Sequence, residues 1–216
     1  MFLGHYGLAF GIKRRAPSAS LGTFAFATQW LDELWPILLL LGVERVRVEP
    51  GYMLENPLVF ESYPISHSLL MAIVWGVVIG GAYYARRRNR RVAWLVALVV
   101  VSHWVLDVPM HAPDLELWPG SRTRVGLGLW NSLAGTLIPE LGFFTAGLFL
   151  YLRGTRARDR VGAWGLWSMV AALVLIFASG FFAPPPATQR AVALGALTLW
   201  LFVPWSAWVD RHRDPA

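Results

Sequence analysis

The sequence contains no cysteine, only one lysine (Lys13) and few charged residues of any kind. The absence of cysteine excludes disulfides and thiolate metal sites. Charged residues make up 15% of the chain and apolar types 56%, which is far from the composition of a soluble domain. The net charge of +6 is gathered in short clusters between apolar runs and does not line one face, so nucleic acid is not an expected partner.

Long apolar runs dominate the rest of the chain. A helix needs about 20 mostly apolar residues to cross roughly 30 Å of hydrocarbon. The runs predict an all-α, polytopic membrane helix bundle in which residues 1–216 form a single domain. About six spans are expected, over Leu21–Val43, Pro64–Ala85, Val92–Met110, Leu129–Leu152, Val161–Ala183 and Ala187–Val209.

Residues 1–15 form a separate N-terminal segment. Its apolar part, Met1–Ile12, is too short to cross a membrane, and this length predicts a short re-entrant or interfacial helix. We expect the four spans within residues 21–152 to carry the polar site. The two spans within residues 161–209 have no ionisable residue in their interiors and are predicted to serve as an apolar scaffold.

Basic residues gather in clusters at 13–15, 86–91, 153–160 and 211–213. In a six-span arrangement all of these clusters fall on one side. Because cytoplasmic loops carry an excess of arginine and lysine, we expect a multi-pass protein of the inner (plasma) membrane with both termini in the cytoplasm. Membrane lipids are then the expected surroundings and partners.

Carboxylates occur inside the expected spans with no lysine or arginine at the same depth: Asp32, Glu33, Asp107 and Glu140. A charge at membrane depth costs roughly 2.5–3.5 kcal/mol on insertion scales and marks a functional site by default. Such acids must be protonated, reach water, or share a bound metal ion. This imbalance is the strongest functional signal in the sequence.

Spacing brings some of these residues onto one helix face. His103, Asp107 and His111 follow one another at four-residue intervals. Imidazole and carboxylate together suit zinc, manganese or ferrous iron, so we predict a metal-ligand pair, with a structural polar pair as the alternative. His111 lies at the end of its span and is predicted to be solvated. For Glu140 the alternative is a protonated acid bonded to a neighbouring helix.

Short motifs also occur in a fixed order: Gly4-His5, an acid in the first span, Ser66-His67-Ser68-Leu69-Leu70, and Ser102-His103-Trp104-Val105-Leu106-Asp107. In this order the chain resembles the inner-membrane metal-dependent hydrolase family, also described as LexA-binding membrane hydrolases. That family is remotely similar to zinc-dependent phospholipases C. The resemblance covers roughly residues 4–111, about half of the chain.

The resemblance implies a shell for a divalent metal ion, zinc in the first place, with iron or manganese as alternatives. By position, its ligands are His5, Asp32, His67, His103 and Asp107. His5 reaches the other ligands only if the first segment re-enters the membrane. The chain departs from the family pattern at Ser62 and Leu34, where the family has a histidine and an aspartate.

These observations lead to three hypotheses of different classes. The first is a membrane-embedded, metal-dependent hydrolase-like protein that acts on an ester or phosphodiester of a lipid, with Glu140 or Glu33 as candidate general base. The second is a transporter or channel for protons, cations or a small solute, in which the acids carry the ion. The third is a non-catalytic membrane subunit or scaffold. A homo-oligomer or a larger membrane complex is compatible with each.

Overall fold

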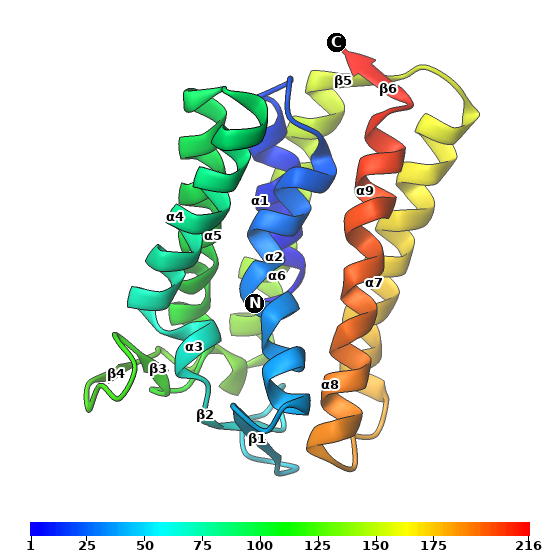
Figure 1. Cartoon of the computed structure of the whole chain (residues 1–216). Helices are drawn as coiled ribbons and strands as arrows, with labels where there is room; N and C mark the ends of the chain where they lie inside the picture. The colour runs from blue at the N-terminus through cyan, green and yellow to red at the C-terminus, as the bar shows by residue number, and fades with distance from the viewer.

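Long helices run side by side in the computed structural model, which describes all 216 residues (Figure 1). Five helical segments are long and apolar enough to cross a membrane. They are α4 (Leu69–Arg87), α5 (Arg90–Met110), α6 (Leu133–Gly154), the segment Val161–Phe182 that ends with α7 (Leu166–Phe182), and Gln189–Asp210. The predicted all-α membrane helix bundle is therefore confirmed.

Helix α2 (Leu21–Leu40) lies at the centre of the bundle. It packs against α1 (Leu3–Lys13), α5, α8 (Gln189–Leu197) and α9 (Phe202–Asp210). Its 20 residues are enough to cross a membrane, but it carries Gln29, Asp32 and Glu33 and is not one of the five apolar segments. The helix with the most polar residues in its middle is therefore the one that the other helices surround.

Helix α1 lies inside the bundle, between α2 and α6, and starts at mid-height (Figure 1). Eight of its 11 residues are buried, so the predicted short N-terminal helix is present and packs within the bundle. Small residues allow the close packing: a Cβ added at Gly147 of α6 would lie 1.8 Å from the carbonyl oxygen of Gly7. This approach carries His5 into the interior.

The predicted second span, Pro64–Ala85, is divided in the structure. A short helix, α3 (Pro64–His67), ends at Ser68, whose backbone is extended. The Ser68 hydroxyl then accepts the amide of Met71 and caps the start of α4. Side-chain caps also start other long helices, from Ser20 in α2, Asn89 in α5 and Ser132 in α6. The break matters because it turns His67 toward the centre of the bundle.

The other span boundaries differ from prediction by only a few residues. A 3-10 turn, η1 (Leu129–Asn131), precedes α6. A π-helical turn, η2 (Val161–Gly165), precedes α7. The last helical segment, Gln189–Asp210, consists of α8, a 3-10 turn η3 (Thr198–Leu201) and α9.

Small pairs of antiparallel strands, which the sequence analysis did not predict, lie at the two ends of the bundle. At the end of the bundle away from the C-terminus lie β1 (Arg45–Val48) with β2 (Leu58–Ser62), and β3 (Leu115–Glu116) with β4 (Arg124–Val125). At the opposite end β5 (Thr155–Ala157) pairs with β6 (Arg213–Pro215). The links that carry all the basic clusters meet at this second end (Figure 1).

Candidate metal centre

The side chains predicted as metal ligands converge from separate helices. His5 comes from α1, Asp32 from α2, His67 from the end of α3, and His103 and Asp107 from α5. They form two overlapping groups that share His103, and within each group the potential ligand atoms lie within 4.8 Å of one another. All of these side chains are buried except Asp32, which is 24% exposed.

The ring of His103 has a defined orientation. Its Nδ1 lies 2.5 Å from the carbonyl oxygen of Thr28, and because a carbonyl only accepts, Nδ1 must carry the proton. In the neutral ring Nε2 therefore presents a lone pair. This atom has no hydrogen-bond partner, yet it lies 3.2 Å from Asp107 Oδ2 and 3.6 Å from Asp32 Oδ1.

A chain of hydrogen bonds orients His67 in the same way. The Ser66 hydroxyl donates to Glu44 Oε2 at 2.6 Å, so it accepts from His67 Nδ1 at 2.7 Å. Glu44 Oε1 also accepts the amides of Ile65 and Ser66. His67 Nε2 then faces Asp32 Oδ1 at 3.4 Å. Histidines that bind a metal ion through one ring nitrogen typically have their other ring nitrogen held by a hydrogen-bond network that leads to a carboxylate, here Glu44.

His5 completes the cluster from the α1 side. Its Nε2 lies 3.1 Å from Asp107 Oδ1, and its ring stacks on that of His103 with 3.8 Å between centroids. The amino group of Met1 lies 2.5 Å from the same Asp107 oxygen and is the positive group nearest to this carboxylate. The cluster is thus rich in carboxylate and imidazole, with no lysine or arginine bonded to it.

Glu140, a predicted general base, has another set of contacts. Its two oxygens accept the backbone amides of Phe2 and Gly4 at 2.7 and 2.8 Å, at the start of α1. A carboxylate at a helix N-terminus satisfies amides that have no partner within the helix. Glu33, the other predicted base, is fully buried and neither of its oxygens has a hydrogen-bond partner.

His111 was predicted to be solvated, and the structure corrects this, because the side chain is only 4% exposed. Its Nδ1 lies 3.1 Å from Asp114 Oδ1, and the same oxygen accepts the Tyr63 hydroxyl at 2.5 Å. Burial and the neighbouring Asp114 carboxylate raise the pKa of Tyr63 well above its usual value, so this hydroxyl remains a donor. His111 Nε2 faces Asp107 Oδ2 at 3.9 Å.

A cavity of about 190 Å³ adjoins the cluster. Asp32, His67, Asp107 and His111 line its polar side, and neither Glu33 nor Glu140 belongs to its lining. The remaining wall is largely aromatic and aliphatic, with no lysine or arginine side chain: Trp35, Phe60, Trp130, Leu58, Ala196 and Leu199, together with Asn56 and Met1.

The donor set fits a divalent transition-metal ion. Two ligands at 2.0–2.1 Å from a tetrahedral zinc lie about 3.3 Å apart. The separations between imidazole nitrogen and carboxylate oxygen across the cluster are 3.1, 3.2, 3.4 and 3.6 Å, and 3.9 Å between His67 Nε2 and Asp107 Oδ2. A lone pair facing a carboxylate at this distance is repulsive unless a cation or a proton lies between them.

Apolar helices around a buried cluster of acids and histidines define the class of the chain: it is a helix-bundle membrane protein with a polar centre. Residues 50–184 match the family described as YdjM inner membrane protein, which is more than half of the chain, and the chain belongs to this family. The matched range includes His67, His103 and Asp107, whereas His5 and Asp32 precede it. No curated protein and no solved structure matches the chain.

Proposed function

We propose that this chain is a membrane-embedded, metal-dependent hydrolase that acts on an ester or phosphodiester of a lipid. One observation carries the proposal. The Nδ1 protons of His103 and His67 are committed to Thr28 and Ser66, so both Nε2 lone pairs face carboxylate oxygens, 3.2 to 3.6 Å away. A divalent cation held within either of the two groups that share His103 would relieve that repulsion, with the imidazole nitrogens and carboxylate oxygens of that group as its ligands.

The proposed ligands form two groups that share His103: His5, His103 and Asp107 in one, and Asp32, His67 and His103 in the other. When bound, a divalent ion supplies Lewis-acid chemistry and makes water acidic enough to attack an ester at neutral pH. Asp32 is the most exposed of the ligands and lines the cavity, so it lies on the side from which water and substrate approach. Glu44 and Thr28 act as positioning groups that hold the two imidazoles.

His111 is the group best placed to contact a bound water. It lines the cavity, and Asp114 holds its Nδ1, which leaves Nε2 free to accept a hydrogen bond. Glu140 is proposed to position α1, and through it His5, because both of its oxygens are engaged by α1 amides. Glu33 faces no part of the cavity, and the hydrolase mechanism assigns it no step.

The cavity supports a lipid as the substrate class. A volume of about 190 Å³ holds the reacting head of a lipid but not its chains, and the wall contributed by Ala196 and Leu199 is apolar. Because no arginine or lysine lines it, the charge of an anionic phosphate would have to be neutralised by the proposed ion and the Met1 amino group. The reacting bond then lies within reach of Asp107 and His111, while the chains remain outside.

Metal content tests this proposal most directly. We would measure zinc, iron and manganese by mass spectrometry in detergent-purified wild type and in His103→Ala and Asp107→Ala. His212→Ala is the matched control, because His212 pairs with Asp159 outside the cluster. We expect at least one metal ion per chain in the wild type and in the control, and its loss in both cluster variants. Lipid esters and phosphodiesters would then be screened as substrates.

A folded but metal-free wild type would refute the hydrolase mechanism. In that case the histidines would be protonated partners of Asp32 and Asp107, which is the arrangement expected of a scaffold or a proton pathway. Proton-flux measurements on Asp32→Asn in liposomes would separate those two alternatives.

A further inference from the structure

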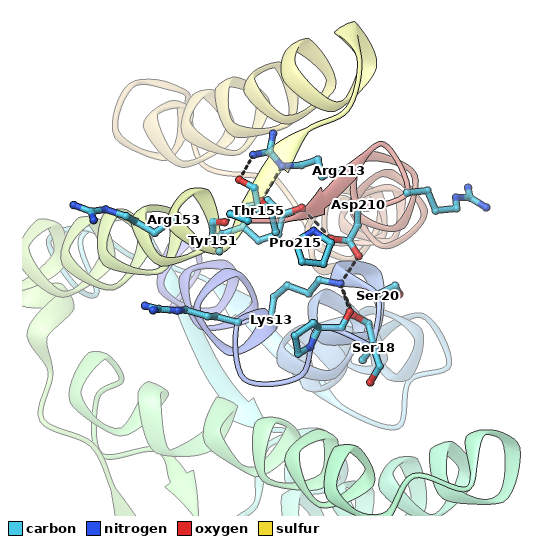
Figure 2. A pocket seen from close by; sticks show the side chains of 15 residues that line it. Lys13, Ser18, Ser20, Tyr151, Arg153, Thr155, Asp210, Arg213 and Pro215 are labelled. Atoms are coloured by element: carbon cyan, nitrogen blue, oxygen red, sulfur yellow. Dashed lines mark hydrogen bonds and ion pairs between the residues drawn. The ribbon is translucent and has the colours of Figure 1, made fainter.

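A second polar hollow lies at the end of the bundle where the basic clusters meet. It has a volume of about 470 Å³, and only three of its 15 lining residues are hydrophobic. Its walls come from the end of α1, the link to α2, the end of α6 with β5, and the end of α9 with β6 (Figure 2). Since the metal cluster contributes none of its lining, this hollow is a separate site.

At the base of the hollow lies an ion pair between Lys13 and Asp210 whose donors and acceptors are already engaged in hydrogen bonds. The Lys13 ammonium donates to Asp210 Oδ2 at 2.7 Å and to the carbonyls of Pro17 and Ala19. Asp210 also accepts the Leu21 amide and the Tyr151 hydroxyl, both at 3.0 Å. All three ammonium protons are used, and the charge of the carboxylate is compensated. The base of the hollow is therefore fixed and carries no net charge.

The rim, by contrast, carries several arginines that form no ion pair, and the last residue, Ala216, lies beside them. Arg14, Arg153, Arg211 and Arg213 all line the hollow, and none of them forms an ion pair with a carboxylate. Arg213 donates only to neutral oxygens, at 2.7 to 3.2 Å. The Arg213 guanidinium is thus already engaged, whereas those of Arg14, Arg153 and Arg211 have neither a hydrogen-bond partner nor a counterion.

We propose that this hollow binds a phosphate-bearing anion. Guanidinium groups match phosphate oxygens in bidentate geometry, and the Ser18 and Ser20 hydroxyls add neutral hydrogen-bonding groups. The hollow also has room for more than the phosphate alone, which suits a glycerophosphate head. Figure 2 shows Arg153 directed outward from the rim, and an exposed side chain changes rotamer within nanoseconds, so it can turn toward an anion.

A membrane phospholipid is the favoured source of this phosphate. The hollow lies at the ends of the apolar helices, at the level where headgroups meet basic residues. The Arg153 guanidinium lies 5.0 Å from the centre of the Phe149 ring, within the range of a cation–π contact. A free phosphate or a soluble phosphate ester offers the same chemistry and is the other source to be tested.

The test compares two double variants of the full-length, detergent-purified chain. Arg14→Gln with Arg211→Gln removes two rim charges, each just after the end of a helix. Arg86→Gln with Arg87→Gln removes two exposed charges from the last turn of α4, outside the hollow. Binding of phosphatidylglycerol, phosphatidylcholine, glycerol phosphate and inorganic phosphate would be measured by native mass spectrometry and by the shift in thermal midpoint.

We expect phosphatidylglycerol to bind, with affinity falling about fivefold for each rim arginine removed. The α4 control should bind like the wild type. Equal stabilisation by glycerol phosphate or inorganic phosphate, lost in the rim variant alone, would support the site but assign it to a soluble anion. An equal loss of lipid binding in the rim and α4 variants would overturn the proposal, because diffuse surface charge would then explain all binding.

Discussion

Replacing Gly147 with alanine should separate α1 from α6 and thereby disturb the metal centre. The added Cβ would lie 1.8 Å from the Gly7 carbonyl oxygen and 2.5 Å from its carbon. A normal contact between carbon and carbonyl oxygen is about 3.3 Å, so the two helices would have to move apart by about 1.5 Å. The clash involves backbone atoms of both helices, so no side-chain rotation can relieve it.

The expected magnitudes follow from this displacement. Overpacking of an interior costs about 1–3 kcal/mol, which lowers Tm by roughly 3–10 °C for a chain of this size. Metal sites tolerate displacements of only about 0.5 Å, so His5 would leave the shell around Asp107 and metal content should fall. Tm would be measured by intrinsic fluorescence in detergent, and metal by mass spectrometry.

Gly142→Ala is the control for this prediction. Gly142 lies on the same helix, is exposed, and an added Cβ would meet nothing within 4 Å. This variant should match the wild type in Tm and in metal content. If Gly147→Ala behaved like Gly142→Ala in both measurements, the close contact between α1 and α6, and with it the placement of His5, would be refuted.

Three further predictions concern other contacts. Ser66→Ala removes the link between His67 and its outer carboxylate and should weaken metal affinity about 10–100-fold, measured by competition with a chelator, whereas Ser179→Ala should not. Asp210→Ala leaves the Lys13 ammonium buried without a counterion and should cost about 3–5 kcal/mol of stability, seen as a lower Tm; the further change Lys13→Met should restore much of it. Hydrogen bonding to His212 lowers the pKa of Asp159, so this exposed pair adds stability above the usual aspartate pKa, which is lost as the pH falls through the lowered one. The small Tm difference between wild type and Asp159→Asn should therefore be present at pH 6 and disappear as the pH falls below the usual aspartate pKa and through the lowered one.

Local patterns in the sequence were enough to predict that two residues of this site, His103 and Asp107, lie together on one helix. His103 and Asp107 share a helix face at four-residue spacing, and their surroundings contain no compensating lysine or arginine. Burial at membrane depth could be inferred because the flanking residues are apolar over the length of a span. These signals involve a single helix, which is why they can be predicted without knowledge of the fold.

His111 and Glu44 could not be found in this way, because remote segments bury them. Gly128 donates its amide to the His111 carbonyl, and Leu127 donates to Val108, so the segment after β4 folds back over the end of α5. Glu44 follows α2 and looks like a solvated acid, but the α3 turn brings the amides of Ile65 and Ser66 onto it. Neither contact leaves a periodic pattern in the sequence.

The break at Ser68 was visible in principle. A serine followed by an apolar run is a helix N-cap signal, and here it follows the Pro-Ile-Ser-His turn. The apolar length of Pro64–Ala85 outweighed that signal and predicted one continuous span. The three strand pairs were missed because strands of two to five residues are too short to show an alternating pattern.

The position of α1 also sets the order in which this protein can be assembled. The amides of Phe2 and Gly4 are bonded by Glu140, which lies 138 residues after Phe2 in the chain. At about 5–20 residues per second, a ribosome makes that carboxylate roughly 7–28 seconds after the first helix. During this interval α1 lacks both its anchor and the glycine surface of α6. The placement of His5 in the buried cluster is therefore fixed only once α6 has been made, late in synthesis.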